Sequence, residues 1–370
     1  MVDLKGQYLK IKNEVDDAIQ EVIDQSSFIN GPQVKQLSES LQSYLNVKHV
    51  IPCANGTDAL QIAMMALNLQ PGDEVITTSY TYVATCEVIA LLKLTPVFIE
   101  VNPDTFTMDP SAIEAVITDK TKAIVPVHLY GQCADMEEIL AIAKKHHLYV
   151  IEDTAQAIGA RYTFSNGQSA AAGCMGDIGT TSFFPSKNLG CYGDGGAIFT
   201  NNDDLADQLR MVANHGQKIR YYHDIVGVNS RLDTIQAAIL NCKLPHLDNY
   251  SAARRKVADQ YDQAFANHPN LKTPVRSSKS THVFHQYTLT CCNVDREAFQ
   301  AYLKSKGIPT MIYYPLPVHL QKGYTMSKYE EGSLTMTETL CKNVISLPIH
   351  TEMTDEIQHY IIEQVLSYFK

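Results

Sequence analysis

The feature that most constrains this chain is a regular alternation of apolar stretches with amphipathic segments over its first two thirds. Stretches of strand length and segments of helical period follow one another between about residues 59 and 212. This alternation is typical of a parallel sheet covered by helices, because each crossover between parallel strands needs a connection as long as a helix. The sequence therefore predicts an α/β fold with a large, mostly parallel sheet.

The periodicity assigns individual elements and indicates two units. Predicted strands span 73–77, 96–101, 123–127, 148–151 and 195–200, and predicted helices span 59–69, 82–92, 112–117, 136–146 and 203–212. From about residue 250 the pattern changes to helices at 251–267, 296–306 and 355–368 with an aromatic strand at 283–291. We therefore expect a helical segment at 1–30 packing across both units, a large domain at 31–248 and a small α+β domain at 249–370.

Composition excludes several classes of protein. The hydrophobic fraction of 45% and charged fraction of 19% are ordinary for a globular protein, and no run of about 18 apolar residues could span a bilayer. The start of the chain lacks the features of a secretory signal, which predicts a cytoplasmic location. A net charge of -10 argues against nucleic acid as a partner. Nine scattered cysteines without a CxxC pair predict reduced thiols and no metal site.

One lysine lies among aromatic, proline and glycine residues. Lys187 ends the run Ser-Phe-Phe-Pro-Ser-Lys at 182–187, and glycines follow it at 190, 193, 195 and 196. Such surroundings remove water from an ammonium group and lower its pKa, so that the amine can attack a carbonyl carbon. On this segment alone, a loop lysine that reaches solvent is an equally good interpretation.

A carboxylate at the end of a predicted strand bears on the choice between these interpretations. Asp153 follows the strand at 148–151, at the edge where open α/β sheets bind ligands. A carboxylate in that place can keep the pyridine nitrogen of pyridoxal phosphate (PLP) protonated, and Gln156 can donate to the ring oxygen. An acidic pair after a strand is by itself more often a helix cap. Together with Lys187, Asp153 favours a PLP site.

The same cofactor needs a phosphate cradle and a flat surface for its ring. Gly56 and Thr57 directly precede the predicted helix at 59–69, where backbone N–H groups can bind a phosphate, and Ser182 can add a hydroxyl. An ordinary N-cap is the commoner outcome for such a motif alone. Tyr82 has the ring needed to stack on a pyridine, although an aromatic residue at helical spacing is more often part of the core.

Several motifs in order resemble the DegT/DnrJ/EryC1/StrS family of nucleotide-sugar aminotransferases, which have the aspartate aminotransferase-like fold (PLP fold type I). The resemblance covers nearly the whole chain and includes Cys-Ala-Asn-Gly-Thr-Asp-Ala-Leu at 53–60, Glu-Asp-Thr-Ala-Gln at 152–156, the lysine run at 182–187 and Gly-Val-Asn-Ser-Arg-Leu-Asp at 227–233. It implies that Lys187 carries PLP as a Schiff base and moves the proton. It also implies that Asp153 contacts the ring nitrogen.

The resemblance assigns further roles. It implies that Gln156 contacts the ring oxygen, that Tyr82 stacks on the ring, and that the phosphate is bound by Gly56, Thr57, Asp58 and Ser182. Asn229 is expected to enter the site from the neighbouring subunit, which implies a homodimer with shared active sites. Related dehydratases carry histidine in place of the lysine, so Lys187 favours an aminotransferase.

The motifs are most similar to members that aminate 3-keto nucleotide sugars with L-glutamate as donor, giving a 3-amino sugar for surface polysaccharide such as lipopolysaccharide O-antigen. A UDP-linked 3-keto-N-acetylglucosaminuronate and a dTDP-linked 3-keto-6-deoxyhexose both remain open, because Tyr313 stands where relatives commonly have histidine. The alternatives are a 4-keto-sugar aminotransferase, a PLP-dependent sugar dehydratase and a PLP-binding protein without catalysis.

Three residues are candidates for substrate binding. Tyr313 and Tyr314 are expected near the sugar. Arg231 is predicted to lie in the first turn of a helix, where a cation opposes the helix dipole. It could hold the carboxylate of the amino donor or of an acidic sugar, and an ion pair with Asp233 is equally consistent with the sequence.

Overall fold

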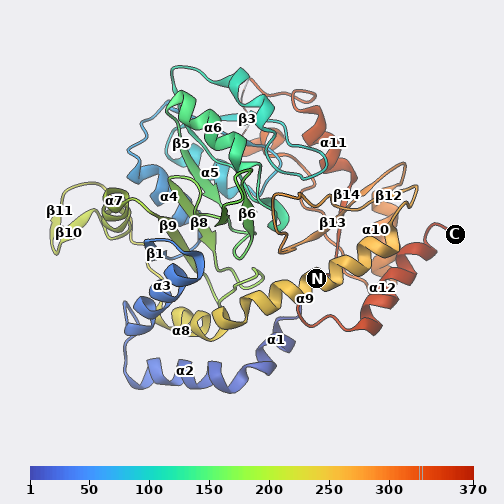
Figure 1. The fold of residues 1–370 in the computed structure, drawn as a ribbon, viewed down its shortest axis with the longest axis horizontal. Coiled ribbons are helices and arrows are strands. Elements are labelled where there is room, and N and C mark those ends of the chain that lie inside the picture. The colour runs from blue at the N-terminus through green and yellow to red at the C-terminus, as the bar shows by residue number, and fades with distance from the viewer. Residues whose placement is uncertain (325, 327) are drawn as a thin grey trace.

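The computed structural model describes residues 1–324, 326 and 328–370 and has a seven-stranded central sheet (Figure 1). Its strand order is β1-β9-β8-β5-β4-β2-β3. The strands are β1 (His49–Cys53), β2 (Glu74–Thr78), β3 (Thr95–Ile99), β4 (Thr121–Ile124), β5 (Tyr149–Asp153), β8 (Ile178–Ser182) and β9 (Gly196–Thr200). All except β9 run in one direction, since β9 pairs antiparallel with both of its neighbours. The prediction of a large, mostly parallel sheet is confirmed.

Helices cover both faces of the sheet. One face is covered by α4 (Gly56–Ala66), α5 (Ala84–Leu91) and α7 (Asp203–Ala213), and the other by α3 (Pro32–Leu45), α6 (Met136–His146) and α8 (Thr234–Lys243). Strand residues alternate between the two faces: Ala123 and Val125 pack toward α4, whereas Ile124 packs toward α6. The strands are therefore buried on both sides, which explains why their sequences are almost continuously apolar.

Two strands of the central sheet were not predicted, for different reasons. β1 contains Pro52, which weakens the strand signal, but β1 is an edge strand of the central sheet and tolerates a proline. β8 contains the polar residues Thr180 and Thr181, whose hydroxyls donate to the carbonyls of Glu152 at 3.1 Å and Thr154 at 3.3 Å. Side-chain hydrogen bonds thus allow a polar sequence to form a buried strand.

The prediction of a helix at 112–117 is wrong. The chain there forms two single 3₁₀ turns, η1 (Pro110–Ala112) and η2 (Glu114–Val116). The segment is too short to stabilise an α-helix by itself. The remaining short elements are η3 (Leu129–Gly131), η4 (Leu244–His246), η5 (Val318–Leu320), η6 (Lys322–Tyr324), β6 (Arg161–Thr163), β7 (Ser169–Ala171), β10 (Gln217–Ile219) and β11 (Tyr222–His223).

The N-terminal segment forms two helices, not one. α1 (Leu4–Lys10) and α2 (Lys12–Asp24) are separated at Ile11. α2 packs along α8, as Figure 1 also shows. α1 reaches the C-terminal part of the chain, where Lys10 forms an ion pair with Glu352 at 2.5 Å.

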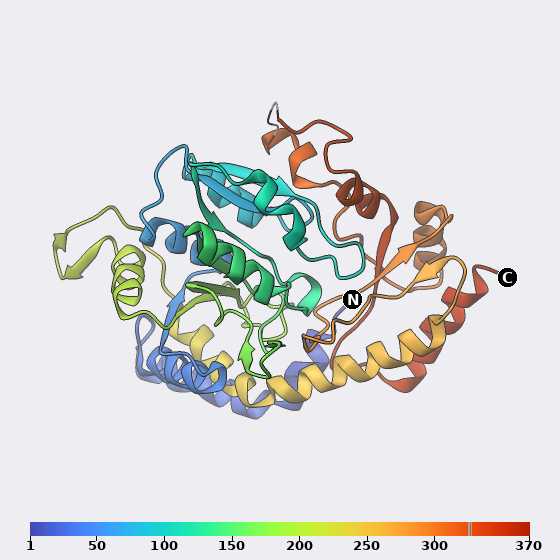
Figure 2. The same ribbon diagram turned by 45° about the horizontal axis from the view of Figure 1, so that its top comes forward.

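The C-terminal part has its own sheet and core. A three-stranded antiparallel sheet of β12 (Leu271–Lys272), β13 (Tyr287–Cys291) and β14 (Val344–Leu347) is accompanied by α9 (Leu247–Phe265), α10 (Arg296–Ser305), α11 (Thr335–Asn343) and α12 (Asp355–Ser367). α9 runs from the end of α8 along the molecule toward α12 (Figure 2). We propose the domain limits 1–30, 31–248 and 249–370, supported by a buried apolar cluster confined to residues 257–365. No helix among the described residues is long and apolar enough to cross a membrane.

The carboxyl half of the sheet depends on the close approach of β8 to the loop at 173–176. A Cβ atom on Gly179 would lie 2.0 Å from the carbonyl oxygen of Gly173. We expect Gly179→Ala to lower the free energy of unfolding by about 3 kcal/mol, since the backbone must shift. Chemical denaturation measures this change. Gly323→Ala is the matched control, because a Cβ there meets nothing within 4 Å; equal stabilities of the two variants would contradict the prediction.

Candidate active site

A cavity of about 1010 Å³ opens at the carboxyl edge of the central sheet and extends to the C-terminal part of the chain. Parallel strands leave ligand sites at this edge. Ten of the twelve residues predicted from the sequence line it: Gly56, Thr57, Asp58, Tyr82, Asp153, Gln156, Ser182, Lys187, Tyr313 and Tyr314. The structure therefore brings together residues that are more than 250 positions apart.

Asn229 and Arg231 do not line this cavity. Asn229 is exposed and pairs with Asn214 in an isolated bridge. α8 begins at Thr234 and has Asp233 as its N-cap, so the prediction that Arg231 lies in the first turn of the helix is wrong. Among the described residues, no ion pair joins Arg231 to Asp233. The argument from the dipole therefore no longer supports a ligand role for Arg231.

Lys187 lies just beyond the end of β8. Its backbone N–H donates to the carbonyl of Phe184 at 2.8 Å, which closes a tight turn and directs the side chain to the cavity wall. Burial lowers the pKa of the Lys187 amine to about 8, and the nearby Asp153 carboxylate opposes this effect. About a tenth of the amine is therefore neutral at pH 7 and about half at pH 8, and this neutral form can act as a nucleophile.

This pKa predicts how PLP binding depends on pH. Below a pKa of about 8 the neutral fraction of Lys187 falls about tenfold per pH unit, so covalent attachment of PLP to the cofactor-free protein should accelerate from pH 6 to 8 and level off near pH 9. Stopped-flow absorbance measures the rate. Nα-acetyl-lysine, whose amine is unperturbed, is the control and should continue to accelerate above pH 10. A rate that rises in parallel for both would contradict the shifted pKa.

Asp153 is held at the carboxyl end of β5 with both carboxylate oxygens engaged. Oδ2 accepts from the Thr85 hydroxyl at 2.9 Å, and Oδ1 accepts from the Ala155 N–H at 3.1 Å. The residue is only 7% exposed yet lines the cavity. Asp153 therefore presents a fixed carboxylate to a ligand, and it is not a helix cap in this structure.

Gln156 connects the cavity to a cluster of tyrosines. Its Oε1 accepts from the Tyr130 N–H at 2.7 Å, and its Nε2 donates to the Tyr314 hydroxyl at 3.1 Å. The hydroxyls of Tyr80 and Tyr130 both donate to the backbone carbonyl of Tyr313. This network joins the loops of the central sheet to the segment that carries the two predicted sugar contacts.

The first turn of α4 fits a phosphate group. The Asn55 side chain accepts from the Asp58 N–H at 2.8 Å and thereby caps the helix, while the N–H groups of Gly56 and Thr57 have no partner within the helix. A Cβ on Gly56 would lie 2.7 Å from Cβ of Ser182, so glycine is what lets this turn approach the end of β8. The residues present thus fit a phosphate-bearing cofactor.

Two predicted ring and phosphate contacts have specific surroundings. Tyr82 is 60% exposed, with its ring centroid 6.3 Å from that of Tyr314, so the alternative interpretation of Tyr82 as a core residue is wrong. The Asp58 carboxylate accepts from the Ser230 hydroxyl at 2.6 Å. Asp58 therefore braces the turn, and its contact with phosphate stays a prediction.

Sequence reasoning missed the polar residues His285 and Gln286 of the cavity wall. Burial, together with the charges of Lys187 and Arg254, holds the pKa of His285 well below its ordinary value, so its imidazole is neutral. The Arg254 guanidinium donates to the His285 carbonyl at 3.2 Å. The signal was present, because these polar residues interrupt the aromatic stretch predicted as a strand at 283–291.

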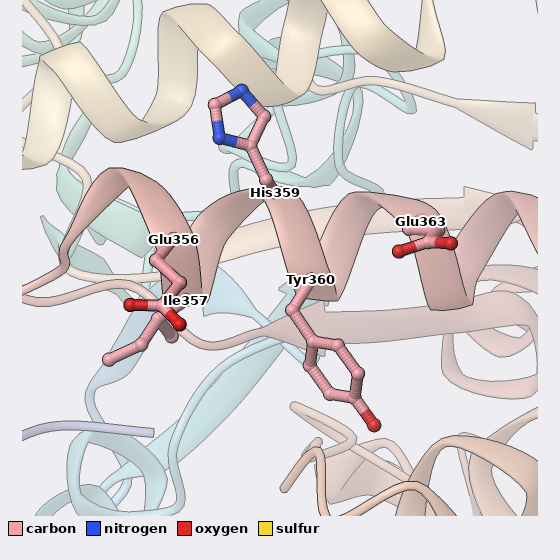
Figure 3. A pocket seen from close by; sticks show the side chains of 5 residues that line it. All are labelled: Glu356, Ile357, His359, Tyr360 and Glu363. Carbon is pink, nitrogen blue, oxygen red and sulfur yellow. The ribbon is translucent and has the colours of Figure 1, made fainter.

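A second hollow, of about 680 Å³, lies on the outer face of α12. Figure 3 shows its lining, which comes from α12 alone: Glu356, Ile357, His359, Tyr360 and Glu363. None of the predicted site residues belongs to it. The predicted catalytic and cofactor-binding residues that line a cavity therefore all lie in the one around Lys187.

Comparison with known proteins gives the family. The family model described as the DegT/DnrJ/EryC1/StrS aminotransferase family matches residues 9–366. The chain belongs to this family. Its members use PLP, and this chain is a PLP-dependent aminotransferase of the same fold.

Two relatives of this family member are each 48% identical to it. One is the "pleiotropic regulatory protein" of Geobacillus stearothermophilus, over 100% of this chain and 98% of that protein. The other is the UDP-2-acetamido-2-deoxy-3-oxo-D-glucuronate aminotransferase of Pseudomonas aeruginosa, over 94% of each. Further relatives, 39% to 43% identical, have names of transaminases for UDP- or dTDP-linked 3-amino sugars.

A solved structure of the family agrees with the fold. DesV of S. venezuelae, determined in complex with a ketimine intermediate, has a TM-score of 0.95 and 38% identity, covering 99% of this chain and 97% of that one. The similarity extends over the central sheet and the C-terminal part alike.

Proposed function

We propose that this aminotransferase transfers an amino group from L-glutamate to a 3-keto nucleotide-linked sugar and releases a 3-amino nucleotide sugar. The observation that carries the proposal is a cavity shared by a lysine of lowered pKa and a buried carboxylate, Lys187 and Asp153. The names of the relatives support the 3-keto position, since several of them aminate carbon 3 of a UDP- or dTDP-linked sugar.

The residues around the cavity would hold PLP at both of its ends. Lys187 would bind it covalently, Asp153 would face the ring nitrogen, and the first turn of α4 with Ser182 would bind the phosphate. Bound PLP supplies an electron sink for the bond broken at the amino-bearing carbon. Once its amine is released, Lys187 can carry the proton, because its pKa of about 8 allows both protonation states near neutral pH.

Tyr313 and Tyr314 would form the sugar side of the site. Burial raises the pKa of both phenols, so they remain protonated hydrogen-bond donors. Tyr314 also accepts from Gln156, which keeps its ring against the expected position of the cofactor. Neutral donors of this kind suit hydroxyl groups of a sugar.

A homodimer would complete the site. The hairpin formed by β10 and β11 projects from the body of the molecule (Figure 1) and exposes Ile219, Tyr221, Tyr222 and Val226. Apolar side chains so exposed favour burial against a second copy of the chain. Asn229 follows this hairpin, and we propose that it reaches the neighbouring active site.

The test uses purified protein loaded with PLP. We expect glutamate to remove the absorbance of the lysine-bound cofactor and release 2-oxoglutarate. A 3-keto nucleotide sugar should then restore the absorbance and gain one amino group by mass analysis. Restoration by a 4-keto sugar instead would assign the alternative aminotransferase activity, and release of water or ammonia would assign a dehydratase. Failure of every amino acid to change the absorbance would overturn the proposed reaction.

A further inference from the structure

A fully buried histidine and glutamate lie behind the cavity and have no part in the proposed chemistry. His128 follows β4 and Glu152 lies in β5, and both side chains are 0% exposed. Their Nε2 and Oε2 atoms are 2.9 Å apart. Burying ionisable groups costs free energy that an apolar pair would avoid. Stability alone therefore does not explain this pair, and a role in fixing the position of other residues does.

The hydrogen bonds of His128 determine its tautomer. Nδ1 accepts from the backbone N–H of Ala134 at 3.1 Å and so carries no proton. The proton of the neutral ring is therefore on Nε2, which donates to Glu152. The ring thus joins two segments in one defined orientation.

Glu152 takes donors on both of its oxygens. Oε1 accepts from the N–H groups of Met175 and Gly176, each at 2.6 Å, and Oε2 accepts from the Gly173 N–H at 2.9 Å in addition to His128. A carboxyl proton would face a donor on either oxygen, so the side chain is a carboxylate. Glu152 therefore fastens the His128 ring to the loop at 173–176.

The same segment holds two residues of the proposed cofactor site. The His128 N–H donates to the Asp153 carbonyl at 3.0 Å, and the Asp153 N–H donates to the Pro126 carbonyl at 3.0 Å. Two residues further on, the Tyr130 N–H donates to Oε1 of Gln156 at 2.7 Å. A displacement of residues 128–130 would therefore move both Asp153 and Gln156.

We propose that His128 and Glu152 are positioning residues: they hold Asp153 and Gln156 in the positions from which these two residues would contact the PLP ring. Neither residue lines the cavity, and both act through the backbone of residues 128–130. The inference rests on the proposed roles of Asp153 and Gln156. Supporting hydrogen bonds of this kind matter because a misplacement of about 1 Å can cost 10²-fold in rate.

The test reads the ring nitrogen directly, with PLP labelled with ¹⁵N in its ring and bound to the intact protein. We expect His128→Asn, which keeps an acceptor for Ala134 but loses Glu152, to move the ¹⁵N NMR signal toward that of an unprotonated pyridine. It should also raise the dissociation constant for PLP about tenfold. His128→Gln places an amide near the position of Nε2 and should restore both values to within about twofold of the wild type.

Glu338→Gln is the matched control. His319 and Glu338 form another buried histidine–glutamate pair, with Nε2 and Oε1 3.3 Å apart, but they hold Ser79 and the turn at 332–334. We expect this variant to lower the melting temperature and to leave the ring signal unchanged. Asp153→Asn is the positive control and should move the signal fully.

The outcomes separate this inference from the proposed function. If Asp153→Asn moves the signal and both His128 variants keep it, His128 and Glu152 serve stability alone and the inference is overturned. An unchanged signal in Asp153→Asn would overturn the proposed role of Asp153 and this inference with it. A normal response to glutamate in either case would leave the aminotransferase reaction standing.

Discussion

Lys187→Ala should lower kcat by about 10⁴-fold or more and abolish covalent attachment of PLP. The lysine lines the cavity, its amine has a pKa of about 8, and we assign to it both the bond to the cofactor and the transfer of the proton. Alanine removes both functions and leaves the turn intact, because the hydrogen bond to Phe184 uses the backbone N–H. Borohydride reduction followed by mass analysis measures attachment, and single-turnover kinetics measure the loss.

Lys243→Met is the control for this variant. Lys243 is 1% exposed, its pKa is also lowered to about 8 by burial, and its Nζ donates to the Gly190 carbonyl at 2.6 Å. Its replacement should cost about 2 kcal/mol of stability, because the carbonyl loses its donor, but should keep the cofactor attached. Attachment that survives in Lys187→Ala and disappears in Lys243→Met would reassign the cofactor lysine.

Asp153→Asn should lower kcat by about 10³-fold with a smaller effect on binding of the sugar. Asparagine preserves size, and its one carbonyl oxygen can accept from the Ala155 N–H while its amide N–H donates to the Thr85 hydroxyl, but it carries no charge to stabilise a protonated ring nitrogen. The effect should therefore appear mainly in kcat. Steady-state kinetics with the sugar that responds in the absorbance assay measure it.

Thr85→Val separates charge from geometry at this site. The substitution removes one hydrogen bond of 2.9 Å to Asp153 and keeps the carboxylate. We expect a loss of about fivefold, equivalent to about 1 kcal/mol. If Thr85→Val were as damaging as Asp153→Asn, orientation and not charge would be the contribution of Asp153.

Local patterns were sufficient for much of the fold. The helix at 136–146 was predicted with its observed bounds, because acidic residues begin it, basic residues end it and its apolar face has a clear period. The polar strand β8 and the edge strand β1 were not predicted, because their stability comes from partner strands elsewhere in the sheet. The helix expected at 112–117 had a local pattern and formed only 3₁₀ turns.

Residue chemistry located most of the candidate site. Lys187 and Asp153 were identified because a lysine in a water-poor segment and a carboxylate at a strand end are each unusual, and a PLP site explains both. His285 was missed because its effect depends on burial beside Lys187 and Arg254, which lie far from it in the chain. Arg231 was assigned to a helix that begins three residues later.

The sequence by itself thus determined the class of fold, the family and the residue types of the site. These follow from short-range periodicity and from motifs whose order is preserved along the chain. The tertiary structure alone decided which of those residues share a cavity, what lowers the pKa of Lys187 and how His128 is tied to Asp153. The reason is physical: burial and hydrogen-bond geometry depend on contacts between segments distant in sequence, which no local pattern specifies.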